Sequence, residues 1–257
     1  MTLPPEQPLT DLEAEHTPQA IRTRLREGPG DSYLKDFILG AVDGTVTTFA
    51  VVAGVSGAGL APGIAIILGV ANLAADGFSM GISNFLGSQA ENQQRDRIRR
   101  EEERQIRVIP EGEREEIRQI FASKGFAGPD LDRAVEVITS DPDRWLNTML
   151  REEHGFPASD VTPWRAGLVT FIGFMAAGLV PLLSYIYLAF FPTQGADPFT
   201  WSIILSAGTF FAIGALKTRF VDQSWYRGGL ETLAVGGAAA VLAYVIGALL
   251  RGVADVV

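Results

Sequence analysis

The chain of 257 residues contains no cysteine and only two histidines, His16 and His154. Without cysteine, neither disulfide bonds nor thiolate metal sites can form. Any bound metal ion must therefore be held mainly through oxygen atoms, with methionine sulfur as the remaining soft ligand. Positive charge is also scarce: 21 Lys and Arg residues stand against 30 Asp and Glu residues, which gives a net charge of −9. Because phosphate recognition needs a positive surface, this balance argues against nucleic acid as a partner.

Residues 1–30 are polar and lack the apolar core of a cleavable signal peptide. Long apolar runs occur further along the chain. A helix needs roughly 20 mostly apolar residues to cross a bilayer. Five segments meet this requirement, at residues 37–60, 62–86, 166–191, 199–216 and 228–250. The third segment contains Pro181, which predicts a kink in that span.

The expected fold class is all-α, a five-span helical membrane protein with a cytoplasmic helical insert between spans two and three. We expect four parts along the chain: a cytoplasmic N-terminal segment, spans one and two, a cytoplasmic helical metal-binding domain, and spans three to five, at residues 1–36, 37–88, 89–162 and 163–257. The charged run 88–108 has neither Pro nor Gly, so the second span should continue as a helix until Pro110. Shorter amphipathic helices are expected over residues 111–123, from 129 onwards, and over 142–154.

Basic residues indicate how the spans are oriented. They occur in the N-terminal segment, in the insert and between spans four and five, whereas the turns after spans one and three carry none. Positive charge concentrates on the cytoplasmic side of membrane proteins. We therefore expect a cytoplasmic N-terminus and insert, and a C-terminus outside or in a lumen. Eighteen of the 21 basic residues are arginine, which is typical of a GC-rich genome and favours a bacterial inner membrane over a vacuolar one.

Two spans each contain one carboxylate, Asp43 in the first and Asp76 in the second. An ionised side chain at the bilayer centre costs roughly 2.5–3.5 kcal/mol, so both carboxylates need an explanation. Thr47 lies one turn from Asp43, while Asn72 and Met80 share the helical face of Asp76. Two such faces predict a hydrophilic translocation path lined by these five residues.

Simpler interpretations of the same residues stay open. Polar side chains within a membrane can serve only to hold helices together. The carboxylates alone fit protons, sodium or divalent metals; Met80 favours a transition metal, although methionine also fills irregular gaps between helices. The first span is rich in glycine, which predicts close helix packing, either at a dimer interface or within one chain. The glycines concerned are Gly40, Gly44, Gly54, Gly57 and Gly59.

The insert is rich in glutamate, and most of these acids alternate with arginine, as is typical of a solvated helix surface. Spacing distinguishes a smaller set. Glu113 and Glu116 are three residues apart on one helix, Met149 and Glu153 are four apart on another, and Glu102 lies near the end of the long charged helix. If the helices fold back on one another, these residues converge on a site of several oxygens and one sulfur. Such a donor set suits Fe²⁺ or Mn²⁺.

Three long segments of the chain resemble one known family. They are residues 37–57, 69–86 and 141–155, with the sequences FILGAVDGTVTTFAVVAGVSG, GVANLAADGFSMGISNFL and DPDRWLNTMLREEHG. They resemble the vacuolar iron transporter family, and the similarity extends over essentially the whole chain after about residue 31. That family moves Fe²⁺, and also Mn²⁺, out of the cytosol in exchange for protons, as a homodimer. The resemblance implies a transporter rather than an enzyme, with metal ions, protons, the lipid bilayer and a second copy as partners and without an organic cofactor.

The resemblance also implies roles for individual residues. It places Asp43 and Met80 in the translocation path near the dimer interface. It assigns the residues of the insert that spacing singled out to a cytoplasmic metal-binding domain that gathers ions. These residues are Glu102, Glu113, Glu116, Met149 and Glu153.

Two positions of the insert depart from the family pattern. The family pairs Glu102 with a second glutamate three residues on, where this chain has Gln105, and it often has two consecutive methionines, where this chain has Met149 and Leu150. An amide binds a metal only through its neutral carbonyl oxygen. We therefore expect Gln105 to be a weaker ligand and the insert to bind fewer ions or bind them less tightly.

Two other protein classes compete with the transporter interpretation. A membrane-anchored, carboxylate-bridged iron oxidase would use paired Glu-x-x-His motifs. Here His16 follows Glu13 at that spacing, whereas His154 follows Arg151, so the pair is missing. A metal sensor would use the spans only as an anchor, and the two membrane carboxylates argue against that.

Overall fold

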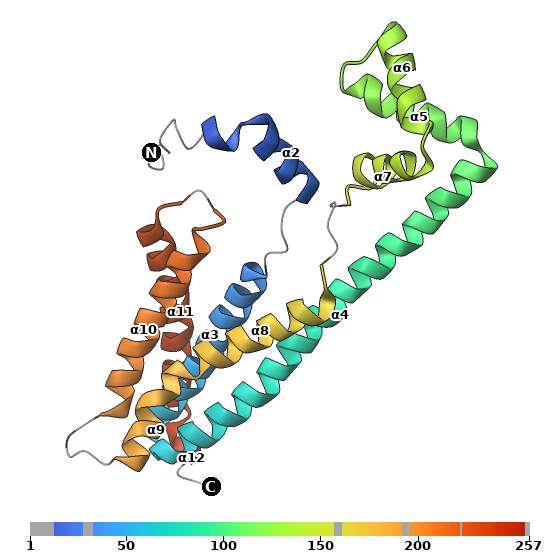
Figure 1. Ribbon diagram of the computed structural model, residues 1–257. Helices are drawn as coiled ribbons and strands as arrows, with labels where there is room; N and C mark the ends of the chain where they lie inside the picture. Colours follow the sequence, from blue (N-terminus) through green and yellow to red (C-terminus); the bar gives the residue numbers. More distant parts are fainter. Residues whose placement is uncertain are drawn as a thin grey trace. The chain divides into compact units, whose positions relative to one another are not determined.

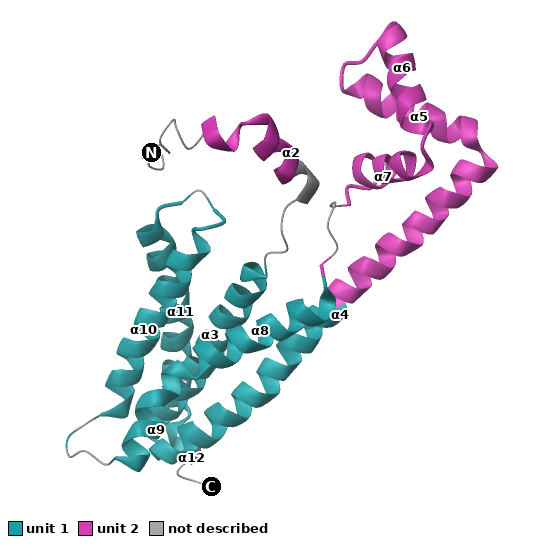
Figure 2. Cartoon of the chain, in the orientation of Figure 1, with its two compact units in different colours: residues 1–8, 32–86, 162–257 teal, residues 9–31, 87–161 magenta. Residues whose placement is uncertain are grey.

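The computed structural model describes residues 13–27, 33–156, 161–191, 195, 197–221 and 223–254. The described residues separate into two compact units (Figures 1 and 2). Unit 1 comprises the described residues of 32–86 and 162–257, and unit 2 those of 9–31 and 87–161. Throughout the described ranges the regular structure is helical and contains no strand. This confirms the expected all-α fold class.

Unit 1 holds five apolar helical segments. They are α3 (Leu34–Ala58), the first part of α4 (Pro62–Val108), α8 (Pro163–Gly178) followed by α9 (Leu183–Phe190), α10 (Pro198–Lys217) and α11 (Trp225–Leu249), with the short α12 (Arg251–Ala254) at the end. All five segments are long and apolar enough to cross a membrane, which confirms the five predicted spans. Large apolar side chains such as Ile67, Val235 and Leu242 are about two-thirds exposed. In a bilayer these side chains would contact lipid.

The third span is interrupted at Pro181, as predicted. A 3₁₀ turn, η1 (Val180–Leu182), replaces the α-helix between α8 and α9, because proline lacks the N–H group that a continuous helix needs. The carbonyl oxygen of Pro181 accepts a hydrogen bond of 2.7 Å from Ser202 Oγ in α10. Ser184 Oγ of α9 donates a 2.8 Å bond to the carbonyl oxygen of Pro198, at the start of α10. Two hydrogen bonds thus connect the region of the interruption to α10.

Glycine lets α3 approach its neighbours closely. A Cβ atom at Gly40 would lie 2.0 Å from the carbonyl oxygen of Thr170, and one at Gly44 would lie 2.3 Å from that of Phe174, both in α8. A Cβ atom at Gly57 would lie 2.2 Å from a carbonyl oxygen of α11. Any larger residue would collide with backbone at these three positions. These glycines therefore pack helices within one chain, which is the second of the two interpretations given above.

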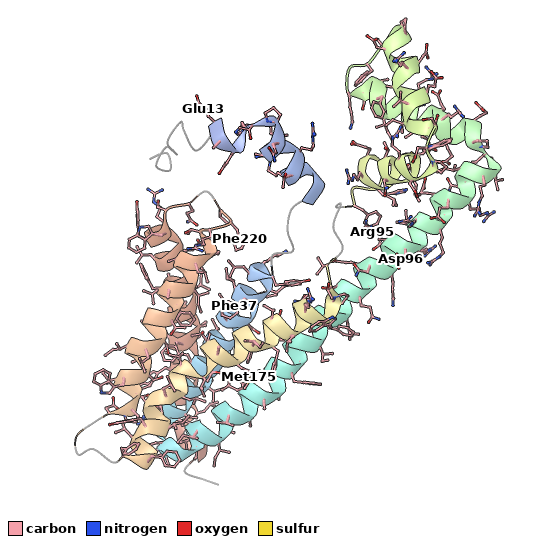
Figure 3. All side chains as sticks on the ribbon, viewed as in Figure 1. Glu13, Phe37, Arg95, Asp96, Met175 and Phe220 are labelled. Atoms are coloured by element: carbon pink, nitrogen blue, oxygen red, sulfur yellow. The ribbon has the colours of Figure 1, made fainter. Side chains whose placement is uncertain are left out.

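Unit 2 contains the remainder of α4 together with α5 (Pro110–Ser123), α6 (Gly128–Thr139), α7 (Pro142–Glu152) and α2 (Pro18–Glu27). The 47-residue α4 continues beyond its apolar part to Val108, as predicted. Figure 3 shows charged side chains along this part of α4, around Arg95 and Asp96, and mostly carbon around Phe37 and Met175 in unit 1. The change of side-chain chemistry within α4 falls where the two units divide.

A small apolar cluster holds α5, α6 and α7 together. Ile117, Val135, Trp145 and Met149 are at most 5% exposed and contact one another. Proline sets where two of these helices begin, because it fits the first turn of a helix: Pro110 starts α5 and Pro142 starts α7. Asp141 caps α7 by accepting a 2.8 Å hydrogen bond from the backbone N–H of Arg144. These local rules fold the insert back on itself.

Candidate metal site and translocation path

The insert gathers acidic side chains from three separate helices. Glu102 comes from α4 and Glu113 from α5, and Glu153 directly follows α7. Next to Glu153, His154 places Nε2 3.0 Å from Oε1 of Glu102 and 3.9 Å from Oε2 of Glu153. One ligand atom from each of Glu102, Glu153 and His154 lies within 4.8 Å of the others. Metal bonds of about 2.0–2.2 Å reach ligands up to about 4.4 Å apart, so the three atoms are close to the spacing of one coordination sphere.

Two of these carboxylates are buried without enough hydrogen-bond donors. Glu113 is fully buried, and neither of its carboxylate oxygens has a hydrogen-bond partner. Glu102 is 3% exposed, and its Oε2 is likewise unpaired although Oε1 meets His154. A buried ionised carboxylate without a partner is costly. A cation among these oxygens would supply the missing compensation.

The electrostatics of the cluster fit a site that holds either protons or a metal ion. Burial, the charges of Glu116, Glu102 and Glu153, and a side-chain contact with Glu102 together raise the pKa of Glu113 to about 7, and burial has the largest effect. Burial and the charge of Glu116 also raise the pKa of Glu153, against an opposing effect of His154. Each carboxyl group therefore retains a proton more readily than a free glutamate. A divalent cation would displace these protons when it binds.

The structure tests how the predicted ligands lie. It brings Glu102, Glu113, Glu116 and Glu153 within electrostatic range of one another, although Glu116 is exposed. Met149 is fully buried in the apolar cluster with Trp145, so a role for its sulfur stays a prediction. Gln105 is half-buried one helical turn after Glu102, and its role as a ligand also stays a prediction.

The predicted translocation path lies in unit 1. Asp43 on α3 and Asp76 on α4 are both half-buried, and their charges are close enough to interact. Asn72 donates a hydrogen bond from Nδ2 to Oδ2 of Asp76. Thr47 donates a 2.9 Å bond to the backbone carbonyl of Asp43, which is a bond within α3. The assignment of these residues to one translocation path stays a prediction.

Met80 is the least distinctive member of the predicted path. It is partly buried and packs against the apolar cluster that contains Val52, Leu73 and Phe174. This contact is what a gap-filling methionine would make. Its role as a sulfur ligand in the path stays a prediction.

Comparison with known proteins extends over almost the whole chain. The sequence model of the VIT family matches residues 34–248. The chain belongs to the VIT family. A vacuolar iron transporter of Toxoplasma gondii is 32% identical over 259 residues, covering 95% of this chain and 85% of that protein. Vacuolar iron transporter 1 of Arabidopsis thaliana is 29% identical over 82% of this chain and 83% of that protein, and the vacuolar iron transporter of Plasmodium berghei is 32% identical over 85% and 82%.

For this VIT family member, the sequence interpretation missed two features. His154 was left out of the metal site because the spacing argument chose residues three or four apart on one helix, and His154 is five residues from Met149 and adjacent to Glu153. Asn84 on α4 was not singled out, yet its Nδ2 donates to Asp36 Oδ1 at 2.9 Å and to Thr170 Oγ1 at 2.7 Å. Asn84 therefore links α3, α4 and α8. The sequence signal that could have identified Asn84 was a polar side chain within the apolar run 62–86.

Proposed function

We propose that this chain transports Fe²⁺ out of the cytosol, with Mn²⁺ as a second cargo, in exchange for protons. The observation that carries the proposal is the presence of one half-buried carboxylate on each of two different spans, Asp43 on α3 and Asp76 on α4. Neither a packing role nor an anchor needs two like charges in a bilayer. The identity of the cargo is supported by the VIT family relatives that are named vacuolar iron transporters.

The proposed sequence of events begins at the insert. Fe²⁺ binds the carboxylates of Glu102, Glu113 and Glu153 and releases protons from them. It then moves to Asp43 and Asp76 and leaves on the opposite side of the membrane. When the ion leaves, the two carboxylates would face each other in a medium of low dielectric, where both cannot stay charged. Uptake of a proton relieves this repulsion and couples metal export to proton entry.

We further propose that a second copy completes the path. Asp43 and Asp76 are only half-buried within one chain, and polar groups of a span avoid lipid. Contact with a second copy would remove these carboxylates from lipid and make the path continuous. Cross-linking in native membranes tests this directly: a cysteine placed beside Asp76, for example Ala75→Cys, should form a disulfide-linked dimer. Ala74 and Ala75 are both exposed, and a strictly monomeric product at both positions would contradict the proposal.

The proposed orientation has the N-terminus and the insert in the cytosol and the C-terminus outside or in a lumen. The distribution of basic residues supports this orientation, and the excess of arginine over lysine supports a bacterial inner membrane over a vacuolar membrane. Because the chain has no cysteine, single-cysteine variants can be labelled from one side of intact cells without background. Ala61→Cys, in the turn between the first two spans, should react with a membrane-impermeant maleimide, and Ser123→Cys in the insert should not. The reverse pattern would invert the orientation.

Flux measurement tests the function as a whole. The protein is reconstituted in liposomes, and Fe²⁺ entry is followed with and without a pH gradient for the wild type and for Asp43→Ala. Glu231→Gln is the matched control, since Glu231 is also an acid of a span but pairs with Lys217 at 3.1 Å. Gradient-driven flux that is lost only in Asp43→Ala supports a proton-coupled exporter. If the wild type binds metal without flux, the protein is a metal sensor rather than a transporter. Metal-stimulated oxygen consumption would indicate an oxidase.

A further inference from the structure

His154 lies where a metal ligand would lie, immediately after Glu153 and beyond the end of α7. Its Nε2 is 3.0 Å from Glu102 and 3.9 Å from Glu153. Its side chain is 26% exposed, so the imidazole borders the buried part of the cluster and is still accessible to an ion that enters from solvent.

A simple ion pair between His154 and Glu102 does not account for this arrangement. Such a pair satisfies one oxygen of Glu102 and leaves the other, together with both oxygens of Glu113, buried and unpaired. Both glutamates are more than nine-tenths buried. An ion bound by His154, Glu102 and Glu153 would give the buried carboxylate of Glu102 a partner and would place positive charge near the unpaired carboxylate of Glu113. The unpaired oxygens are thus a second observation, independent of the histidine contacts, that indicates a bound cation.

We propose that His154 is a direct ligand of the metal ion in the insert, together with Glu102 and Glu153. The proposal rests on the proposed function for the identity of the ion, but the site itself is defined by these residues alone. His154 supplies a donor that compensates for Gln105, which provides at most a neutral carbonyl oxygen. The insert then binds its ion with a mixed nitrogen and oxygen set in place of carboxylates only.

A nitrogen ligand changes which ions the insert prefers. Imidazole binds Fe²⁺, Co²⁺ and Zn²⁺ well, whereas Mn²⁺, Mg²⁺ and Ca²⁺ favour oxygen. His154 should therefore raise the affinity of the insert for Co²⁺ and Fe²⁺ more than its affinity for Mn²⁺. A histidine that only orients Glu102 would change the affinities for all of these ions by a similar factor.

The decisive experiment uses full-length protein in detergent, with any polyhistidine tag removed and one equivalent of Mn²⁺ added. Pulsed electron paramagnetic resonance detects the nuclear modulation of a nitrogen bound to Mn²⁺. The chain has only two histidines, so labelling with ¹⁵N-histidine should shift the modulation to the ¹⁵N frequency without any mutation. His154→Gln should abolish the modulation, and His16→Gln, the matched control, should leave it intact. Weaker Mn²⁺ binding in Glu113→Gln would show that the added ion occupies the insert. If the ion occupies the insert and the wild-type protein still gives no histidine nitrogen signal, the proposal is overturned.

Metal titration gives a second, independent measurement. His154→Gln should weaken Co²⁺ binding by about tenfold or more, as loss of metal-site residues usually does, and weaken Mn²⁺ binding by less. An equal change for both ions would assign His154 a positioning role only and contradict the proposal. The metal site and the transport function are tested separately. A histidine signal without flux would support this site and reject the transporter. Flux without the signal would support the transporter and reject this site.

Discussion

The two units of this protein contain carboxylates in different surroundings. In unit 1, Asp43 and Asp76 are half-buried, and Asp76 receives a hydrogen bond from Asn72. In unit 2, Glu113 is completely buried without any hydrogen-bond partner. A half-buried, partly satisfied carboxylate can bind and release an ion at little cost, whereas a buried and unsatisfied one favours an occupied state. This difference fits the proposal that ions pass along the spans and are retained in the insert.

The largest expected effect separates these two roles directly. Asp43→Asn should reduce Fe²⁺ flux to the level of protein-free liposomes and change the metal affinity of the insert by less than about twofold, because residues that share no partners act independently. Glu113→Gln should do the reverse, lowering the insert's affinity by about tenfold or more with flux retained at saturating Fe²⁺. Flux and equilibrium binding measured on both variants check this. Loss of both properties in both variants would show that passage and retention are one process.

The next effect concerns the packing that holds the path in place. Gly44→Ala should lower the free energy of unfolding of the detergent-solubilised protein by about 1–3 kcal/mol, since the new Cβ would lie 2.3 Å from a backbone oxygen of α8. Gly208→Ala is the matched control, because a Cβ at that helical position meets nothing within 4 Å, and alanine there should stabilise by up to about 1 kcal/mol. Thermal unfolding compares the two. Equal melting temperatures would mean that α3 and α8 separate readily.

A further effect is a pH dependence confined to the insert. Glu113 has a folded pKa of about 7, above its usual 4.5, so the folded insert binds more protons than the unfolded one between these values. Without metal, its stability should therefore fall as pH rises from about 5 to 8. Hydrogen exchange over residues 110–152, corrected for intrinsic rates and measured with a chelator, should show less protection at pH 8. Glu113→Gln should remove most of this dependence, whereas Glu115→Gln, at an exposed position that pairs with Arg118, should retain it.

The smallest expected effect concerns Gln105, which stands where the family has a negatively charged glutamate. Gln105→Glu restores a carboxylate one turn from Glu102 and should raise Fe²⁺ affinity of the insert by about three- to tenfold, or about 1 kcal/mol. Gln119→Glu adds the same charge at an exposed position of α5 and serves as the control. Titration of both variants measures the difference. Unchanged affinity in Gln105→Glu would show that position 105 does not contribute to the site.

Local chemistry made most of the helices predictable from the sequence. Proline marks where α5 and α7 begin and where the third span breaks, and uninterrupted apolar runs mark the spans, because these signals act within a few residues of the chain. Contacts between distant segments were harder to foresee. Gly44 could have faced a second copy or α8, and only the folded chain shows that it faces α8.

The candidate site shows the same limit. Spacing within a helix identified Glu113, Glu116 and Glu153, since residues three or four apart share a face. His154 follows the last turn of α7 and shares no helical face with the other ligands, so no periodicity could assign it. Its place beside Glu102, fifty-two residues earlier in the chain, depends on how α4, α5 and α7 fold together.

The interruption at Pro181 has a mechanical consequence. α8, before the interruption, packs along α3, while α9 packs against α10 and shares one side-chain hydrogen bond with it, and Pro181 of η1 accepts a second from Ser202 of α10. The two halves of the third span thus belong to different helix groups. Because the proline nitrogen has no hydrogen to donate, no α-helical hydrogen bond is made at this residue. Pro181 therefore joins the half of the span beside α3, the helix of Asp43, to the half anchored on α10.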